Sequence, residues 1–230
     1  MQPTFLPWLG YFALIQSVDK FGFLDVVQFE SRSWQQRNRI LINNHPTWLT
    51  IPTSLPQGRE TPINQVLINR EHYSGESIQE TLRHAYRKKP GFDYVEKNLF
   101  KILLTPPTHL SRLNITLIKE IALALKIDST FICAGDLNVS GRKADLLLNI
   151  CKELGASTYV SPIGSKVYLE TYEGFISSGI NLEYQEFDHP VYSQGSKDFI
   201  SHLSIVDAIC NLSLETTCNI IRSGGMQINV

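Results

Sequence analysis

The sequence predicts an α/β fold, because strand-like and helix-like segments alternate through much of its 230 residues. The second half holds three strands and two helices in turn, at residues 130–134, 143–154, 158–161, 169–178 and 180–185. This alternation is typical of a parallel sheet with right-handed crossovers. Apolar residues make up 43% of the chain, which is enough for a substantial core. We therefore expect one α/β domain over residues 1–230, with a Rossmann-like, mostly parallel sheet.

The first thirty residues predict a strand–helix–strand unit. Gln2 and Pro3 follow the end of a first strand, and a helix covers about residues 10–19, with an apolar stripe at helical spacing. A second strand covers residues 21–29. Almost nothing precedes Gln2 that could form the first strand. Either one or two residues supply that strand, or the start codon has been placed too late.

A helical segment at about residues 70–125 interrupts the alternation. Short strands precede it at residues 47–53 and 66–68. Ser77 and Glu80 predict a capping box at the start of its first helix. Further helices are predicted at residues 93–104, from Asn114 onward, at 203–212 and at 214–221. The expected architecture is thus a Rossmann-like sheet with an inserted helical segment.

Composition excludes several classes of function. The net charge is −1, from 21 basic and 22 acidic residues, whereas general nucleic-acid binding needs a basic excess. We see no signal peptide and no run near the roughly 20 apolar residues of a membrane span, and we expect a cytoplasmic protein. The four cysteines are widely spaced and lack metal-ligand spacing. They predict reduced, mostly buried thiols and no metal site.

Polar side chains cluster in the first thirty-nine residues and predict a pocket. They are expensive to bury without partners, and they comprise Gln2, Asp25, Gln28, Arg37, Asn38 and Arg39. Ligands of open α/β sheets bind outside the carboxyl ends of the strands. Asp25 lies towards the end of the second predicted strand, where it could bind a hydroxyl or orient a base. A capping or turn carboxylate is an equal alternative.

Aromatic and basic residues surround that cluster. Trp34 and the run from Arg37 to Arg39 are expected on a loop, where two guanidinium groups beside an amide suit a phosphate or carboxylate. A solvated basic loop is the ordinary alternative. Trp8 and Tyr11 could stack on a sugar or base ring, although aromatic residues near a helix start more often belong to the core.

Further candidates come from the second half. His189 follows the last predicted strand and suits general acid/base chemistry, with Tyr192 and Gln194 nearby as substrate contacts. Asp207 could orient His189, or it could cap a helix together with Ser204. Lys143 begins a predicted helix, whose N-terminus could contact a phosphate. This last signal is weak, because basic residues flank many helices.

Several motifs together resemble the WbqC-like protein family. They are Gln2-Pro3 with residues 7–12, 24–29, Trp34 with residues 37–40, 48–52, 84–86, 151–156, 159–161, 168–169, 189–194, 203–207 and Asn211. The resemblance covers nearly the whole chain. Family members usually have a longer first strand before the Gln-Pro pair, and a second acidic residue where this chain has Val26.

The resemblance implies a function in glycan chemistry. The family occurs in bacterial surface-polysaccharide (O-antigen) gene clusters. It implies a transferase acting on a nucleotide-linked (amino)sugar, or on its acyl or aminoacyl substituent, in lipopolysaccharide biosynthesis. The implied partner is a small molecule, either a nucleotide-sugar or an acyl donor, and no cofactor is specified. In this scheme Asp25 or His189 acts as the base.

Two alternatives remain. The order of strand, proline-containing loop, Gly10-Tyr11, helix and strand ending in Asp25 resembles nucleotidylyltransferases with an HxGH motif. Tyr11 stands where that motif has its second histidine, which argues against adenylyl transfer even if the fold is shared. A non-catalytic adaptor of a glycan-assembly complex is the other alternative, and Val26 in place of the usual acid favours it.

Overall fold

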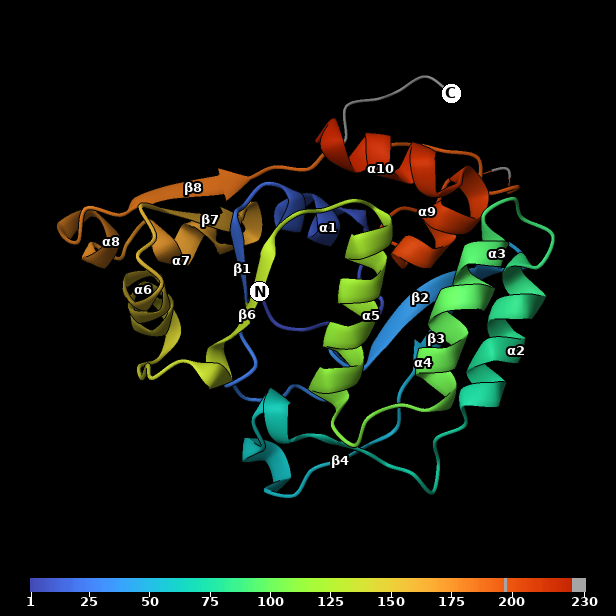
Figure 1. Cartoon of the computed structure of the whole chain (residues 1–230), viewed down its shortest axis with the longest axis horizontal. Helices are drawn as coiled ribbons and strands as arrows, with labels where there is room; N and C mark the ends of the chain where they lie inside the picture. Colours follow the sequence, from blue (N-terminus) through green and yellow to red (C-terminus); the bar gives the residue numbers. More distant parts are fainter. Residues whose placement is uncertain (197, 225–230) are drawn as a thin grey trace.

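The computed structural model describes residues 1–196 and 198–224 (Figure 1). The strands are β1 (Lys20–Phe23), β2 (Arg37–Ile42), β3 (His45–Thr50), β4 (Thr53–Ser54), β5 (Leu67–Ile68), β6 (Thr130–Cys133), β7 (Thr158–Pro162) and β8 (Asn181–Gln185). The helices are α1 (Leu9–Gln16), α2 (Gly75–Tyr86), α3 (Phe92–Tyr94), α4 (Phe100–Leu104), α5 (Leu110–Ala124), α6 (Lys143–Glu153), α7 (Lys166–Leu169), α8 (Gly174–Ser177), α9 (Ile205–Leu212) and α10 (Leu214–Arg222). A π-helical turn at Val95–Leu99 joins α3 to α4.

The strands confirm a mixed α/β class but form separate pairs in the described part of the chain. β1 pairs with β6 and β7 pairs with β8, both in parallel, whereas β2–β3 and β4–β5 are antiparallel. The strands that the sequence assigns to one parallel sheet therefore lie in two parallel pairs. A single Rossmann-like or nucleotidylyltransferase-like sheet stays a prediction.

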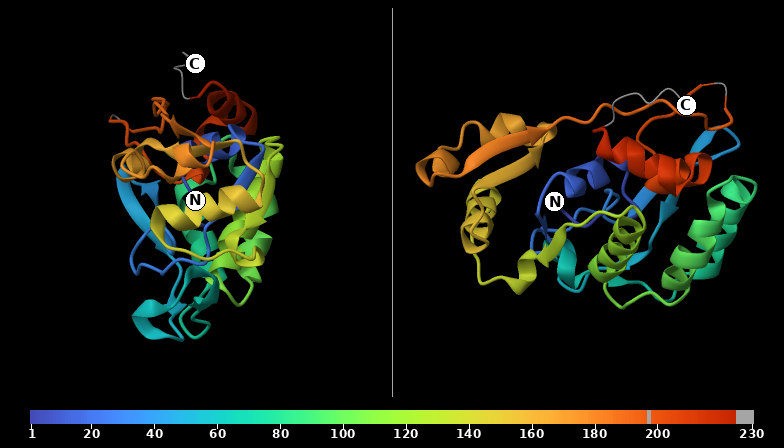
Figure 2. Two further views of the ribbon diagram at one scale, coloured as in Figure 1. Left: turned by 90° about the vertical axis from the view of Figure 1, so that its left-hand side faces the viewer. Right: turned by 45° about the horizontal axis from the view of Figure 1, so that its top comes forward.

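Two hydrophobic clusters hold the chain together. The larger one contains fully buried Phe5, Phe12 and Phe23 and gathers residues from α1, α2, α5 and α9. The smaller one, centred on Leu169 and Phe175, belongs to the segment from α6 to β8. Figures 1 and 2 show this segment at one end of the molecule. The prediction of a single domain stays open, since the smaller cluster belongs to one continuous segment.

The predicted helical segment is present as α2 to α5, with two corrections at helix starts. α2 begins at Gly75, and the side chain of Ser74, not Ser77, caps it by accepting a hydrogen bond from the Ser77 N–H. A Cβ at Gly75 would lie 2.4 Å from the carbonyl oxygen of Leu103, so this start packs directly on α4. α5 begins at Leu110, four residues before the predicted start at Asn114.

Three further expectations about elements were wrong. The predicted helix at 169–178 is two short helices, α7 and α8. The second predicted strand ends at Phe23, because the chain turns there and the carbonyl of Asp25 accepts from the Asn64 N–H. The expected loop at residues 37–39 is the start of β2. Asn43 and Asn44, with φ of 49° and 63°, form the two-residue turn to β3.

Candidate functional site

Arg37 and Arg39 belong to β2, and their side chains point away from the core. Alternate residues of a strand point to opposite faces, so Asn38 and Ile40 are buried while Arg37 and Arg39 are half-buried on the other face. On the core side, the hydroxyl of Tyr86 from α2 accepts a hydrogen bond from the Leu41 N–H. Figure 1 shows α2 and α4 in front of the β2–β3 hairpin. The two arginines therefore project to the side away from these helices.

Arg37 and Arg39 pack against two tryptophans, and we call these four residues the Arg–Trp surface. The Arg37 guanidinium carbon lies 4.1 Å from the ring centroid of Trp48, and that of Arg39 lies 5.6 Å from Trp34 and 5.7 Å from Trp48. The indole rings lie 5.4 Å apart, with 46% of Trp34 and 43% of Trp48 exposed. Such exposed aromatic area flanked by cations suits a flat, anionic ligand.

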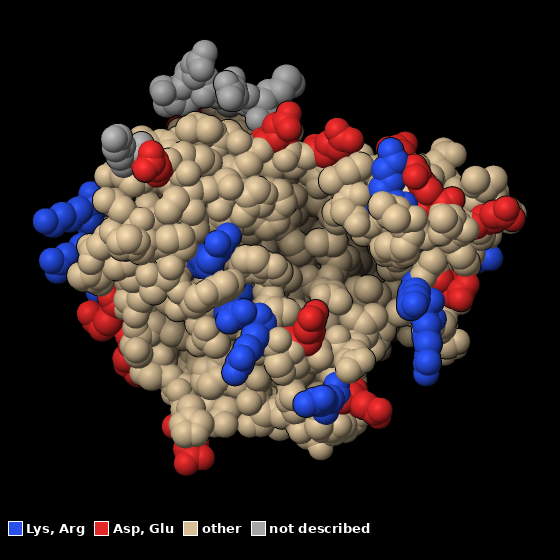
Figure 3. Space-filling model, turned by 180° about the vertical axis from the view of Figure 1, so that it is seen from behind, with Lys and Arg blue, Asp and Glu red and all other residues tan. Residues whose placement is uncertain are grey.

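Neither guanidinium group has an acidic partner in the part of the chain that the structure describes. Among the described residues neither arginine forms an ion pair, and both Nε atoms are buried without a hydrogen-bond partner. Figure 3 shows the reverse of the molecule, where Lys and Arg side chains gather near the middle of a largely uncharged face, beside a hollow. A phosphate or carboxylate group can accept hydrogen bonds from both guanidinium groups without displacing a protein carboxylate.

Asn38 fastens the N-terminal loop beside these arginines. Its side-chain NH₂ donates to the carbonyls of Phe5 (3.1 Å) and Leu6 (2.8 Å), and Leu6 has a φ of 42°. The side chain of Asn38 is thus occupied by backbone, which makes it a positioning residue. The backbone amide of Ile205 donates to the carbonyl of Pro7, which brings the chain before α9 to the same place.

A cluster of rings lies next to the Arg–Trp surface. Trp8 stacks on His189 with 5.9 Å between centroids and 10° between planes, and lies 4.7 Å from the ring of His202. The two histidine rings lie 5.1 Å apart. Burial, and then the charge of Arg39, lower the pKa of His202 below its usual value. Arg39 therefore lies near enough to His202 for its charge to act on this ring.

The imidazole ring of His189 is in the neutral form that a general base requires. Burial lowers its pKa, so the ring is neutral at pH 7. Its Nδ1 lies 3.0 Å from the carbonyl oxygen of Pro190, which can only accept, so this contact requires a hydrogen on Nδ1. The lone pair of the neutral ring is then on Nε2. This tautomer leaves Nε2 able to take a proton from a substrate.

Asp25 lies in a different environment. Its Oδ1 accepts from the Gly135 N–H at 2.9 Å, beyond the carboxyl ends of β1 and β6, and only 6% of the residue is exposed. Burial raises the pKa of Asp25, and the charge of Asp136 adds to the rise. Its described contacts are with other residues than those of His189. A direct catalytic role for Asp25 stays a prediction.

Asp207 is at the centre of a buried network instead of beside His189. Its carboxylate accepts from the hydroxyls of Tyr86 (2.8 Å) and Tyr192 (2.9 Å) and from the side-chain amide of Gln194 (3.0 Å). Ser204 caps α9 through the Val206 N–H, as the sequence indicates. None of the described contacts of the Asp207 carboxylate is with His189, so the structure shows no direct contact through which Asp207 could orient that ring. Tyr192 lies between them, since its ring packs 6.3 Å from that of His189.

The remaining candidates are spread over the molecule. Tyr11 is buried, and its hydroxyl donates to the carbonyl of Gln2, so the core alternative holds for this ring. The Gln2 side chain accepts from Gln35. Gln28 donates to the carbonyl of Arg59, and Lys143 is an exposed first residue of α6. As ligand contacts these residues stay predictions.

Neither Trp48 nor His202 is among the site residues that the sequence predicts, although Trp48 belongs to one of the family motifs. Trp48 stands opposite Arg39 in the β2–β3 register, and the Asn43-Asn44 pair was the signal that could have revealed the hairpin. His202 has a φ of 59° in an irregular segment, and no sequence pattern marks it. Within the described ranges, no set of three or more His, Cys, Asp or Glu residues is arranged to hold a metal ion. In the same ranges, we find no helix with the length and apolar character that crossing a membrane requires.

Comparison with known proteins gives one family and one relative. The profile of the WbqC-like protein family matches residues 2–218. The chain is 28% identical to "Uncharacterized protein Rv1507c" of Mycobacterium tuberculosis (strain ATCC 25618 / H37Rv) over 217 residues, which cover 94% of this chain and 93% of that protein. No solved structure matches. The matched range includes β2, β3 and both histidines of the ring cluster, and the chain therefore belongs to the WbqC-like protein family.

Proposed function

We propose that this protein is a transferase acting on a nucleotide-linked (amino)sugar, or on its acyl or aminoacyl substituent, in bacterial surface-polysaccharide biosynthesis. The observation that carries the binding step is the Arg–Trp surface. Among the described residues the two guanidinium groups have no acidic partner and lie beside two half-exposed indoles, which supports recognition of both parts of a nucleotide. Phosphates bind to the guanidinium forks, and a base or sugar ring stacks on indole.

The chemical step in this proposal uses His189. Its neutral ring accepts a proton at Nε2 from the hydroxyl or amine of the acceptor, as that atom bonds to the transferred group. Arg39, whose charge acts on His202, stabilises negative charge on the donor's leaving group. Trp8, stacked on His189, keeps the imidazole plane in one orientation. Asp25 is not required for this step.

A thermal-shift screen tests the binding step. Nucleotide-sugars, nucleoside triphosphates, acyl thioesters and free amino acids are compared with and without magnesium. A ligand that binds only the folded state raises stability by RT ln(1 + [L]/Kd). We expect nucleotide-sugars to raise Tm in the wild type and not in the Arg37→Gln/Arg39→Gln double variant. Arg87→Gln, at the exposed end of α2, is the matched control.

An adaptor is the second candidate, and one observation favours it. Trp34 and Trp48 expose nearly half of their surface beside two arginines, and Trp and Arg are the residues that dominate protein–protein interfaces. An adaptor would keep its partner after His189→Ala and lose it after Trp48→Ala. A transferase would lose turnover after His189→Ala while keeping nucleotide-sugar binding. A magnesium-dependent Tm rise with nucleoside triphosphate alone would instead support a nucleotidylyltransferase relative.

A further inference from the structure

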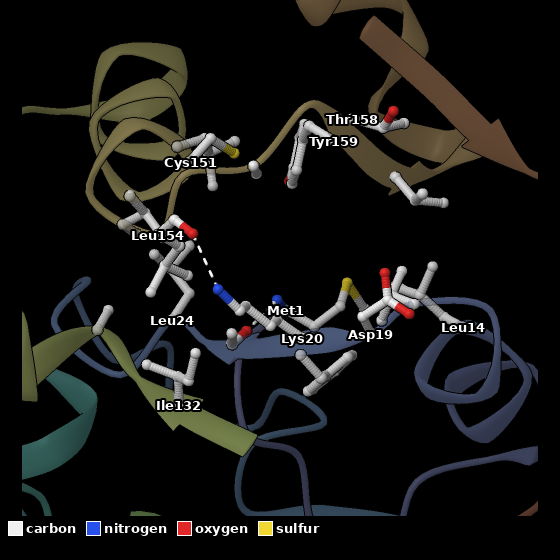
Figure 4. A pocket seen from close by; sticks show the side chains of 18 of the residues that line it. Met1, Leu14, Asp19, Lys20, Leu24, Ile132, Cys151, Leu154, Thr158 and Tyr159 are labelled. Atoms are coloured by element: carbon white, nitrogen blue, oxygen red, sulfur yellow. Dashed lines mark hydrogen bonds between the residues drawn. The ribbon is translucent and has the colours of Figure 1, made fainter. Parts of the chain in front are cut away.

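The cavity shown in Figure 4 has a volume of about 520 Å³ and lies between β1 and the segment from α6 to β7. None of the described residues that line it belongs to the Arg–Trp surface, and Trp8, His189 and His202 are not among them either. The walls of this cavity therefore do not hold the two histidines in place. The buried network around Asp207, in contrast, reaches the ring cluster through Tyr192.

The start of α9 gives the Asp207 carboxylate a fixed place beside the site. Asp207 lies in the first turn of this helix and is buried. The Ser204 N–H, just before the helix, donates to the carbonyl of Arg39 at 2.8 Å. The Ile205 N–H donates to the carbonyl of Pro7 in the N-terminal loop at 2.9 Å. The carboxylate is therefore held relative to both β2 and that loop.

Two of the three hydrogen bonds to this carboxylate have a direction that other bonds fix. The Tyr86 oxygen accepts from the Leu41 N–H at 3.0 Å, so its own hydrogen points to Asp207. The Gln194 Oε1 accepts from the Ile200 N–H, so the NH₂ of Gln194 donates to Asp207 at 3.0 Å. Burial raises the pKa of Asp207, and these hydrogen bonds oppose the rise by favouring the ionised form.

The third hydrogen bond restricts Tyr192. Among the described residues Asp207 forms no ion pair, so its hydrogen bonds are what compensates for burying the carboxylate. The hydroxyl of Tyr192 provides one of them at 2.9 Å. A tyrosine side chain has two torsion angles, and a bond at the far end of its ring restricts both. The position of the Tyr192 ring therefore depends on Asp207.

That ring packs against the imidazole of His189. The two centroids lie 6.3 Å apart, with 23° between the planes. Trp8 lies 5.9 Å from the same imidazole, with 10° between the planes. The imidazole is thus nearly parallel to one ring of the N-terminal loop and to one ring attached to α9. A movement of Tyr192 would change the tilt of His189 against Trp8.

We infer that Asp207 is a positioning residue for His189, acting through the hydroxyl and the ring of Tyr192. Its carboxylate has no described contact with the imidazole, so it orients His189 without exchanging a proton with it. The bond to Tyr86 connects the same carboxylate to β2 instead. This inference rests on the proposed function only for the role of His189 as the base.

Tyr192→Phe and Tyr86→Phe test the inference as a matched pair. Each removes one phenolic hydroxyl from the same carboxylate and keeps its ring. Tyr86→Phe also leaves the Leu41 N–H without this partner, so we expect it to lower Tm by a few degrees more than Tyr192→Phe does. Asp207→Ala is a poorer test, because it leaves three buried donors without their acceptor and endangers folding as a whole.

The first readout is the Cε1–H resonance of His189, measured by NMR in the ligand-free protein. We expect Tyr192→Phe to shift and broaden this resonance, and Tyr86→Phe to leave it at its wild-type position. The order of the two variants is then reversed between Tm and the histidine signal, whereas a purely structural network would give one order for both. A wild-type resonance in Tyr192→Phe, or an equal shift in both variants, would overturn the inference.

Turnover is the second readout, with the nucleotide-sugar that the thermal-shift screen identifies. We expect Tyr192→Phe to lower kcat by about tenfold or more and to change KM by less than about twofold, because the base moves while the Arg–Trp surface does not. A wild-type kcat in this variant would also overturn the inference. A wild-type protein without turnover would contradict the proposed function instead, and the NMR comparison would still decide the role of Asp207.

Discussion

The guanidinium carbon of Arg37 lies 4.1 Å from the ring centroid of Trp48, while its buried Nε has no hydrogen-bond partner among the described residues. The contact with Trp48 holds the side chain in place, and in the proposed function the guanidinium group binds a phosphate of the ligand. Arg37→Lys keeps the charge but loses the planar fork. We expect it to weaken nucleotide-sugar binding by about tenfold, the cost of one bidentate pair. Isothermal titration measures this, and affinity unchanged from wild type would show that Arg37 does not contact the ligand.

Gly10 controls the position of Trp8. A Cβ at Gly10 would lie 2.2 Å from the indole ring, so Gly10→Ala must push that ring off His189. The α1 backbone itself tolerates alanine. We expect altered tryptophan fluorescence and reduced turnover, with a Tm change of only a few degrees.

Gly164→Ala is the control for this variant, since a Cβ added at Gly164 would have no neighbouring atom within 4 Å. A Gly10→Ala protein with wild-type fluorescence and activity would remove Trp8 from the site.

We expect Asn38→Asp, which adds a charge, to lower the stability of the protein more than Asn38→Ala, which truncates the side chain. Asn38→Asp keeps the shape but directs a carboxylate oxygen at the carbonyls of Phe5 and Leu6, which have no proton to offer. Asn38→Ala leaves two carbonyls unsatisfied, for a loss of about 2–4 kcal/mol. We expect the Asp variant to be the less stable of the two at pH 7. Urea denaturation ranks them, and the reverse order would mean that the amide bonds contribute little.

Asp25 should make stability fall as pH rises. Its folded pKa is raised by burial above the usual 3.8, so the folded state binds more protons than the unfolded state in the interval above 3.8. Its contribution is therefore complete below pH 3.8 and declines until the raised pKa is passed. Asp25→Asn keeps an acceptor for the Gly135 N–H and removes the titration.

We expect Asp25→Asn to be more stable than wild type at pH 7 and equal to it near pH 3, in urea melts across this range. Exposed Asp188 provides the control substitution. A constant difference at all pH values would contradict the raised pKa.

Periodicity predicted most helices, because apolar stripes such as that of α5 need no distant partner to be seen. The predicted α9 and its Ser204 cap are confirmed for the same reason. Helix starts were missed where tertiary contacts decide them, as when Gly75 packs on Leu103. The pairing of strands was not accessible either, since β1 meets β6 across more than a hundred residues.

The candidate site was predictable in its chemistry but not in its arrangement. Arg37, Arg39 and Trp34 were recognised as residue types that suit an anion and a ring. Their placement on a strand depended on a hairpin whose turn was overlooked. Asn38 shows the limit clearly, because an amide that binds ligand and an amide that binds backbone look the same in sequence.

The two-asparagine turn between β2 and β3 has a consequence for how this family member can vary. Ile42 and His45 pair directly across it, so its length sets which residues of β3 face outward beside Arg37 and Arg39 of β2. Losing or gaining one residue there shifts the hairpin by half a pleat. Because Asn38 fixes β2 to the N-terminal loop, the residues of β3 would change faces, and Trp48 would turn away from Arg37 and Arg39. Insertions elsewhere on the surface change only the length of a loop, whereas here a single codon would exchange the inner and outer faces of β3.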